Sequence, residues 1–227
     1  MATMTTLLTV KTTDHFDTWA DIYDLKAREN KWKSPKVLFE LQRKFLHPDD
    51  KILDLGCGTG LTSELYHKIQ MDVWGLDGSK KMIEICRKKN LHKDLKIFDL
   101  SQENLCLPYQ NNFFEQAISS GAMYFIADIE PIIKEVARIL WAGGTFVFDI
   151  QEPEKNKQDY LIDSNNKLIG KVTKEKTGVN VYFNDFIDVK KLLQKYRFYI
   201  VEKEEFHGFT SQAFDEVHLT AIVAKLG

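Results

Sequence analysis

Three glycines and one acid form the group of residues with the clearest chemical potential in this sequence. Gly56, Gly58 and Gly60 follow the short apolar run 51–55, and Asp77 stands at the end of the next apolar run. Glycines after a strand let the backbone turn sharply and approach a ligand closely. An acid at the end of the second strand can accept hydrogen bonds from ribose hydroxyls. The pattern therefore predicts a site for a ligand that contains a nucleoside.

Two details distinguish this loop from a dinucleotide-binding loop. Leu61 occupies the position where a dinucleotide fingerprint has its last glycine or alanine, and the third glycine falls at Gly60 instead. Asp54 lies two residues before the first glycine, where a carboxylate would repel a pyrophosphate but could hold an amino group, directly or through water. An NAD-dependent oxidoreductase is therefore a remote alternative.

The elements that must position these residues alternate between strand and helix. Apolar runs predict strands at 51–55, 72–76, 95–98, 116–119 and 145–150, and helical spacing predicts helices at 62–69, 79–89 and 128–140. Leu61, Leu65 and Ile69 mark one face of the first helix, Ser79 is the expected N-cap of the second, and Gly143-Gly144 is the expected stop of the third. Such alternation predicts a parallel sheet with its ligand beyond the carboxyl ends of the strands.

The pattern changes after residue 150. Antiparallel strands are expected at 161–171 and 179–183, a helix at 185–195, and a final antiparallel pair at 198–206 and 216–224, in which His207 and His218 face each other. We expect 151–184 to be an insertion over the site, 1–14 to be a disordered tail, and 15–227 to be one domain.

Composition argues against several classes of protein. The 227 residues are 44% hydrophobic and 28% charged, as in a globular domain, and the formal net charge of −2 gives no basic surplus for nucleic acid. Cys57, Cys86 and Cys106 are widely spaced and form no disulfide or zinc pattern, and the six histidines show no metal spacing. We expect reduced thiols, a cytoplasmic location, no metal, no nucleic-acid partner and no membrane partner. No oligomeric state is predicted.

Several segments of the sequence resemble the motifs of a known family. The segment 53–60 resembles motif I of the class I S-adenosylmethionine-dependent methyltransferases, and Asp77-Gly78-Ser79 resembles the segment after it. Phe98-Asp99-Leu100 matches the end of the family's third strand, where an acid usually meets the adenine amino group. The similarity extends from about Trp19 to Ile150, and more weakly to the C-terminus.

Two family motifs are present with substitutions. The segment 113–117 resembles the start of the family's fourth strand, with Glu115 in place of the usual Asp, and 138–144 resembles the "LKPGG" corner, with Trp141-Ala142 in place of Lys-Pro. The resemblance implies an α/β fold: a doubly wound, mostly parallel, Rossmann-like seven-stranded sheet whose last strand is antiparallel.

The resemblance also implies S-adenosylmethionine as cofactor and S-adenosylhomocysteine as product. Helices within 15–47 would form a lid with an aromatic side chain near the methionine end of the cofactor. The expected cofactor-binding residues are Trp19, Tyr23, Arg28, Asp54, Gly56, Cys57, Gly58, Gly60, Asp77, Gly78, Ser79, Met82, Asp99, Leu100, Ser120 and Gly121.

Methyl transfer is an in-line displacement that needs a positioned nucleophile and only sometimes a base. His15, Tyr124 and Tyr182 are the candidate bases. The stretch 119–124 lacks the Asn/Asp-Pro-Pro-Tyr motif of enzymes that methylate base and amide nitrogens. Together with the absence of a basic surplus, this favours a small-molecule acceptor. A protein methyltransferase and a non-catalytic S-adenosylmethionine-binding protein are the alternatives.

Overall fold

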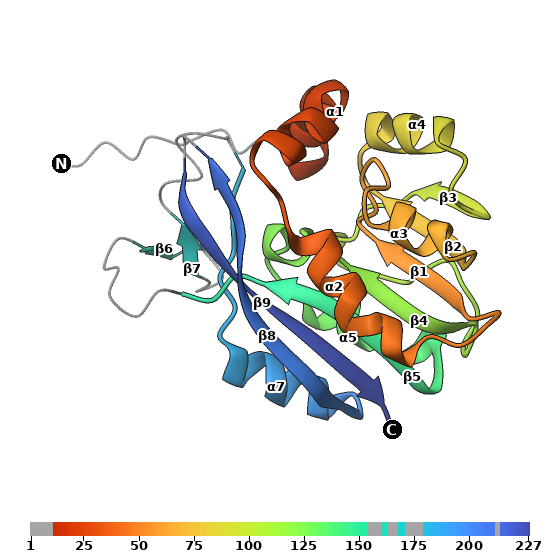
Figure 1. Ribbon diagram of the computed structural model, residues 1–227. Coiled ribbons are helices and arrows are strands. Elements are labelled where there is room, and N and C mark those ends of the chain that lie inside the picture. The colour runs from red at the N-terminus through yellow and green to blue at the C-terminus, as the bar shows by residue number, and fades with distance from the viewer. Residues whose placement is uncertain (1–10, 154–159, 163–167, 171–178, 212–213) are drawn as a thin grey trace.

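A seven-stranded sheet forms the centre of the molecule (Figure 1). The computed structural model describes residues 11–153, 160–162, 168–170, 179–211 and 214–227. The strand order is β3-β2-β1-β4-β5-β9-β8, with bounds β1 (Lys51–Leu55), β2 (Asp72–Asp77), β3 (Asp94–Ile97), β4 (Phe114–Ser119), β5 (Leu140–Ile150), β8 (Phe198–Ser211) and β9 (Phe214–Leu226). Strands β1 to β5 pair in parallel, and β9 runs antiparallel to both of its neighbours. The predicted fold class is confirmed.

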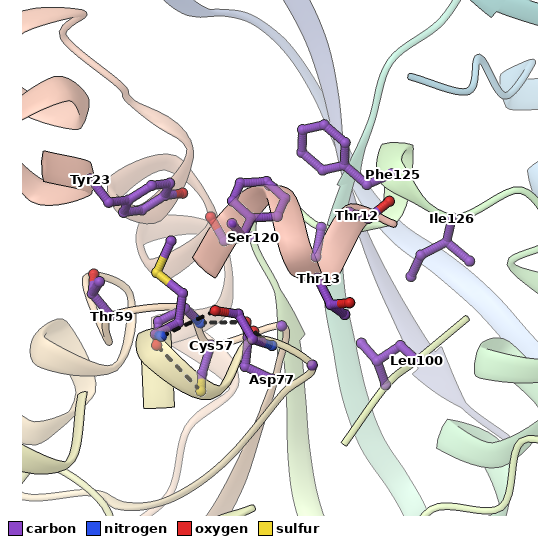
Figure 2. A pocket seen from close by; sticks show the side chains of 18 of the residues that line it. Thr12, Thr13, Tyr23, Cys57, Thr59, Asp77, Leu100, Ser120, Phe125 and Ile126 are labelled. Atoms are coloured by element: carbon purple, nitrogen blue, oxygen red, sulfur yellow. Dashed lines mark hydrogen bonds between the residues drawn. The ribbon is translucent and has the colours of Figure 1, made fainter. Parts of the chain in front are cut away.

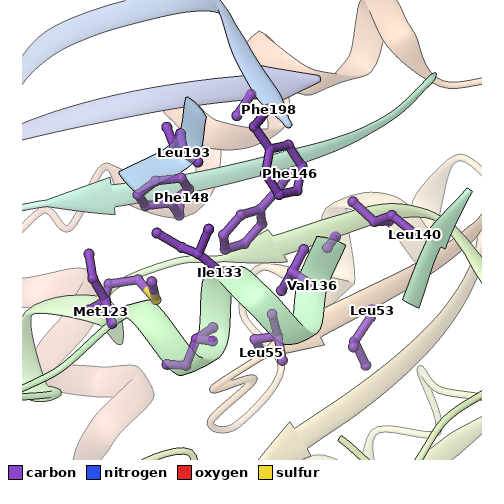
Figure 3. Close-up of a cluster of buried hydrophobic side chains, with 14 of the residues drawn as sticks. Leu53, Leu55, Met123, Ile133, Val136, Leu140, Phe146, Phe148, Leu193 and Phe198 are labelled. Atoms are coloured by element: carbon purple, nitrogen blue, oxygen red, sulfur yellow. The ribbon is translucent and has the colours of Figure 1, made fainter. Parts of the chain in front are cut away.

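Helices cover both faces of this sheet. Within the described residues they are α1 (Thr12–Glu29), α2 (Ser34–Gln42), the 3-10 turn η1 (Arg43–Phe45), α3 (Ser63–Lys68), α4 (Lys80–Lys88), the 3-10 turn η2 (Met123–Phe125), α5 (Glu130–Ile139) and α7 (Phe186–Lys195). Because successive side chains of a strand point to opposite faces, β1 supplies both layers of the core. Ile52 packs in the layer that includes α2 and α3, whereas Leu53 and Leu55 pack with α5 and α7 (Figure 3).

The helix after β4 ends earlier than the sequence predicts. Helix α5 stops at Ile139 and β5 begins at Leu140, so Gly143 and Gly144 lie inside the strand and do not stop the helix. A Cβ on Gly144 would lie 2.6 Å from the backbone oxygen of Glu115. This glycine therefore allows close approach of neighbouring backbone at the β4–β5 corner.

The prediction of which face the first helix buries is also wrong. Helix α3 buries Ser63 and Tyr66, whereas Ile69 is 47% exposed. The Tyr66 hydroxyl donates a 2.6 Å hydrogen bond to Gln42, and its ring meets Phe39 edge to face. Contact with α2 thus selects the face of α3. By contrast, the prediction of Ser79 as the N-cap of α4 is confirmed, because its hydroxyl accepts from the amide of Met82.

The remaining predictions concern the N-terminus and the region after β5. Helix α1 begins at Thr12, three residues inside the stretch expected as a tail, and residues 1–10 lie outside the described residues. Within the expected insertion, β6 (Tyr160–Ile162) and β7 (Leu168–Gly170) pair antiparallel, while 154–159, 163–167 and 171–178 lie outside the described residues.

The second strand expected there, at 179–183, is reduced to a single bridge at Tyr182, whose amide donates to Tyr124. The expected facing of His207 and His218 is confirmed, since they pair in register with ring centroids 4.4 Å apart. Across the described residues, no helix has both the length and the apolar character that crossing a membrane requires.

Candidate cofactor and acceptor site

A pocket lies beyond the carboxyl ends of the strands, where the strand order reverses between β1 and β4 (Figure 2). It contains about 800 Å³ of empty space, counting space open to solvent. Its lining residues come from α1 and the segment after it, from the loops after β1, β2, β3 and β4, and from η2.

The loops after β1 and β2 form one wall of the pocket, which we call the glycine-loop wall (residues 56–58 and 77–79). Gly56 and Gly58 have φ angles of 73° and 53°, which side-chain-bearing residues rarely adopt. A Cβ on Gly56 would lie 2.5 Å from that of Ala122, whereas the corresponding position on Gly58 faces open space. The loop therefore presents backbone to the pocket.

Asp77 connects the two loops of this wall. Its carboxylate accepts hydrogen bonds from the backbone amides of Gly58, at 2.8 Å, and Ser79, at 2.7 Å (Figure 2). Burial raises the pKa of Asp77 to about 6, against the opposing effect of these two amides. A carboxylate offers about four lone-pair positions, so it retains acceptor capacity for a pair of hydroxyls.

The N-terminal turn of α1 and the loop after β3 close one end of the pocket. A Cβ on Gly78 would lie 2.5 Å from Cγ2 of Thr13 and 3.4 Å from Cα of Asp99, so α1 and this loop approach the β2 loop closely. Asp99 is exposed, and its carboxylate accepts from the amide and hydroxyl of Ser101 at 2.8 and 2.6 Å. Leu100 supplies an apolar surface beside them.

Four aromatic residues line the pocket as a second wall, which we call the aromatic wall (Phe16, Tyr23, Trp32 and Phe125). Neighbouring rings meet edge to face: the centroids of Phe125 and Phe16 are 5.1 Å apart, those of Phe16 and Tyr23 6.3 Å, and those of Tyr23 and Trp32 6.1 Å. Figure 2 shows Tyr23 and Phe125 across the pocket from Asp77. This wall offers flat apolar surface to a ligand.

Two acids of α1 attach the aromatic wall to the glycine-loop wall. Asp17 accepts from the Ser79 hydroxyl at 2.5 Å and from the Lys81 amide at 3.0 Å. Asp24 accepts from the Thr59 hydroxyl at 2.5 Å and from the Lys89 ammonium at 2.8 Å. Helix α1 therefore lies beside α4 and covers the pocket through polar contacts (Figure 1).

A short hydrogen-bonded chain runs from the pocket to a buried carboxylate. Ser120 lines the pocket, and its hydroxyl lies 3.0 Å from that of Ser34. The Ser34 hydroxyl donates to Asp149, which also accepts from the Gly121 amide at 2.8 Å. Burial raises the pKa of Asp149 to about 6, although both of these hydrogen bonds oppose the shift. The carboxylate is fully buried, so its route to the pocket is through the two hydroxyls.

Most of the expected cofactor residues line this pocket, namely Tyr23, Gly56, Cys57, Gly58, Asp77, Gly78, Ser79, Met82, Asp99, Leu100, Ser120 and Gly121. Trp19, Arg28, Asp54 and Gly60 do not line it. Arg28 is exposed, and the ring of Trp19 lies against that of His15. Asp54 is 1% exposed and accepts from the hydroxyl of Ser63 at 2.6 Å. Burial raises its pKa to about 7.

None of the three candidate bases lines the pocket. Burial raises the pKa of Tyr124 well above its usual value and lowers that of His15. Both shifts follow from the cost of a charge away from water. The hydroxyl of Tyr182 accepts from the side chain of Asn180 at 3.2 Å.

Several lining residues were missed by sequence reasoning, namely Thr12, Thr13, Phe16, Trp32, Thr59, Leu61, Thr62, Ser101, Ala122 and Ile126. The lining residues of α1 could have been predicted from helical spacing. Thr12, Phe16 and Tyr23 lie at i, i+4 and i+11, which is one face of a helix. Trp19, at i+7, also belongs to this face, so helical spacing alone does not separate it from the lining residues, whereas Arg28 points away. Trp32 lies beyond the helix, so helical spacing carries no signal for it.

Comparison with known proteins identifies the family. The model of a methyltransferase domain family matches residues 53–148. Uncharacterized protein MJ1252 of Methanocaldococcus jannaschii is 32% identical over 202 residues, which cover 83% of this chain and 76% of that protein. Demethylmenaquinone methyltransferase of Symbiobacterium thermophilum is 33% identical over 141 residues, covering 58% of this chain and 55% of that one. The chain spans about half the length or less of several curated relatives.

A solved structure with the same fold is the putative methyltransferase of Haloferax volcanii in complex with the Trm112 methyltransferase activator. It has a TM-score of 0.73 at 18% identity, and the alignment covers 94% of this chain and 96% of that one. The predicted cofactor, S-adenosylmethionine, agrees with these matches. Given 32% identity across most of two chains and a methyltransferase domain over β1 to β5, this protein belongs to the class I, Rossmann-like, S-adenosylmethionine-dependent methyltransferases.

Proposed function

We propose that this enzyme methylates a small molecule with a flat, mainly apolar ring, held between the aromatic wall and Ser120. The observation that carries the proposal is that one pocket contains both the glycine-loop wall and four aromatic side chains, under a helix that covers it. Aromatic rings bind flat apolar groups through edge and face contacts. The demethylmenaquinone methyltransferase among the relatives has a ring acceptor by its name, which supports this class.

The residues of the glycine-loop wall fit the cofactor. S-adenosylmethionine supplies a methyl group activated by a sulfonium. Asp77 accepts from the two ribose hydroxyls with the capacity left by its amide bonds. The open side of Gly58 gives the backbone room to approach the ligand, and Asp99 lies where the adenine amino group is expected.

The segment that covers the pocket keeps water away from the reacting groups. Helix α1 acts as the lid and is attached through Asp17 and Asp24. Helix α2, which was also expected in the lid, supplies none of the lining residues. Excluding water strengthens the electrostatic interactions inside a site and protects its reactants from side reactions. Tyr23 lines the same pocket, and burial, followed by the charge of Asp77, raises the pKa of its hydroxyl, so this group stays neutral.

Ser120, Ser34 and Asp149 take the proton that the acceptor loses. The acceptor donates to the Ser120 hydroxyl, Ser120 donates to Ser34, and Ser34 donates to the carboxylate. Each hydroxyl accepts one proton and passes another on, so the charge changes only at Asp149. A pKa of about 6 keeps this carboxylate ionised near neutral pH and still basic enough to accept a proton.

The acceptor class is tested with cofactor labelled in its methyl group. The purified chain is incubated with extract of its own cells, separated into small molecules, RNA and protein. We expect label in the small-molecule fraction, and in compounds that partition into organic solvent. Label in RNA or protein would contradict the acceptor class, and cofactor binding without any labelled product would indicate the non-catalytic alternative.

The proton path is tested with Asp149→Asn, which keeps the shape of the side chain. Loss of a general base should lower kcat by about 10²- to 10⁴-fold. The wild-type rate should rise with pH through about 6, and the variant should lose this limb of the profile. Ser34→Ala should have the same direction of effect, with cofactor affinity as the control. An unchanged pH profile in a folded Asp149→Asn protein would contradict the path.

We also infer a cytoplasmic location. All three cysteines are free thiols, with Cys57 and Cys86 buried and Cys106 exposed. An exposed free thiol is typical of a reducing compartment. Fluorescence microscopy of the tagged protein in its own cells tests this location, and export of the protein would contradict it.

A further inference from the structure

Two thiols and an imidazole meet beside the glycine loop. The Sγ atoms of Cys57 and Cys86 and one ring nitrogen of His92 all lie within 4.8 Å of one another. Cys86 Sγ is 3.6 Å from Nδ1 of His92. Cys57 belongs to the glycine loop, Cys86 to α4, and His92 to the segment before β3. The fold thus joins residues whose positions in the sequence showed no metal pattern.

We propose that Cys57, Cys86 and His92 bind a soft metal ion with a filled d shell, Zn²⁺ or Cu⁺. Thiolates and imidazole are the ligands that these ions prefer. Tetrahedral Zn²⁺ with bonds of about 2.3 Å to sulfur and 2.0–2.1 Å to nitrogen places its ligand atoms about 3.5–3.8 Å apart. The separation of Cys86 Sγ and His92 Nδ1 falls in this range, so these two atoms already have the spacing of metal ligands.

The second nitrogen of His92 is held as a metal-binding imidazole requires. Nε2 of His92 lies 2.7 Å from the hydroxyl of Ser63, and this hydroxyl donates to Asp54 at 2.6 Å. Since the single hydroxyl proton of Ser63 points to Asp54, the hydroxyl accepts from Nε2–H. The ring is then the tautomer with its free lone pair on Nδ1, facing the sulfur. Such outer partners orient and strengthen imidazole ligands.

Gly60 and Gly75 have no side chain, and this leaves room for the sulfur and imidazole atoms of the cluster. A Cβ on Gly75 would lie 2.9 Å from Cys57 Sγ and 3.0 Å from Cδ2 of His92. A Cβ on Gly60 would lie 2.9 Å from Cys86 Sγ. Gly75 is in the middle of β2, where the strand backbone itself does not require glycine. The close packing around both sulfurs indicates a preformed group, and a bound ion would tie the glycine loop to α4.

The test uses the full chain without a histidine tag, reduced and kept under argon, with no cofactor added. Equilibrium dialysis against Zn²⁺ alone or Cu⁺ alone should give one ion per chain. Co²⁺ should give the near-ultraviolet charge-transfer bands of cobalt bound to thiolate. This spectrum uses the unaltered chain, so it decides the question even if a variant fails to fold. Absence of both results in the wild-type chain would overturn the proposal.

Variants locate the ion. Cys86→Ser should reduce affinity more than Ser63→Ala, for which loss of an outer partner predicts about a 10- to 100-fold reduction. Cys106→Ser is the matched control, because Cys106 is exposed and outside the cluster, and it should bind as the wild type does. Equal binding by folded Cys86→Ser would overturn the proposal. The test needs no methyl transfer, so its result is independent of the acceptor.

Discussion

The two walls of the pocket are built in different ways. The glycine-loop wall presents backbone and one carboxylate, and its form depends on positive φ angles at Gly56 and Gly58 and on the amides bonded to Asp77. The aromatic wall presents side chains from α1, from the segment after it and from η2. Its members touch through ring edges and are attached to the other wall by two acids of α1.

This difference explains what each wall does in the proposed function. A wall made of backbone fits one constant ligand, because the chain positions it through hydrogen bonds that side-chain variation leaves intact. A wall made of aromatic side chains can be reshaped by substitution without altering the sheet. We therefore assign the cofactor to the glycine-loop wall and the choice of acceptor to the aromatic wall.

The largest expected effect comes from the glycine-loop wall. Asp77→Ala removes one or two hydrogen bonds to the cofactor, each worth about 1.5–3 kcal/mol, so affinity for S-adenosylhomocysteine should fall by at least about tenfold. Titration calorimetry measures the change. Asp72→Ala, at the opposite end of β2, is the matched control and should bind normally. Unchanged affinity in folded Asp77→Ala would contradict the placement of the ribose at this wall.

A smaller and different effect is expected at the aromatic wall. Phe16→Ala removes its two ring contacts within the aromatic wall, each worth about 0.5–1.5 kcal/mol beyond burial, and should raise KM for the acceptor several-fold. Affinity for S-adenosylhomocysteine should change less. Trp19→Ala, three residues away but outside the pocket, is the control in steady-state kinetics. If Trp19→Ala raised KM as much as Phe16→Ala, the face assigned to α1 would be wrong.

Loosening the attachment between the walls should have a weaker effect on binding. Asp24→Asn removes the charge from the ion pair with Lys89. Asp17→Asn weakens the hydrogen bond that the carboxylate accepts from the Ser79 hydroxyl. The double variant should exchange the amide hydrogens of α1 faster and bind S-adenosylhomocysteine a few-fold less tightly. Hydrogen–deuterium exchange measures the first effect. Asp21→Asn, exposed on the same helix, should leave exchange as it is, and equal exchange in all variants would refute the attachment.

The smallest expected effect is on the pH dependence of stability, which differs between acids whose pKa is raised and acids whose pKa is lowered. Burial raises the pKa of Asp54 to about 7 and those of Asp77 and Asp149 to about 6, so these three carboxyls bind more protons in the folded state than in the unfolded chain between about pH 4 and 7. Their contribution to stability therefore falls as pH rises through this window. The pKa of Asp17 is lowered, because hydrogen bonds from Ser79 and Lys81 outweigh burial, so its contribution is lost as pH falls.

Urea unfolding at pH 5 and pH 8 measures this balance. Asp149→Asn should flatten the change in unfolding free energy between the two values, relative to the wild type. Asp17→Asn should leave that change nearly as it is, because both pH values lie above the pKa of Asp17 in either state. A steeper change in Asp149→Asn would contradict the raised pKa.

The two walls also differ in how far the sequence predicts them. Gly56, Gly58 and Asp77 could be assigned from spacing, because backbone turns leave a glycine signature and the acid must end a strand. The alternation of strands and helices likewise predicted the parallel pairing of β1 to β5, although not their order in the sheet. Trp32 carries no such signature, since an aromatic residue in a pocket has the same sequence pattern as one in the core.

Contacts between distant segments account for the remaining differences. The buried face of α3 is selected by Gln42, and Gly144 serves the β4–β5 corner, neither of which local periodicity can reveal. The cluster of Cys57, Cys86 and His92 is the clearest example. Cys57 is distant in sequence from Cys86 and His92, and only the packing of α4 beside the glycine loop brings it to them.

The most direct test of the central claim is a calorimetric titration of the purified chain with S-adenosylhomocysteine, with NADH as the comparison ligand. We predict one molecule of S-adenosylhomocysteine per chain and no heat of binding from NADH. Binding of NADH, or of neither ligand, would contradict the assignment of the glycine-loop wall to the methyl-donor cofactor.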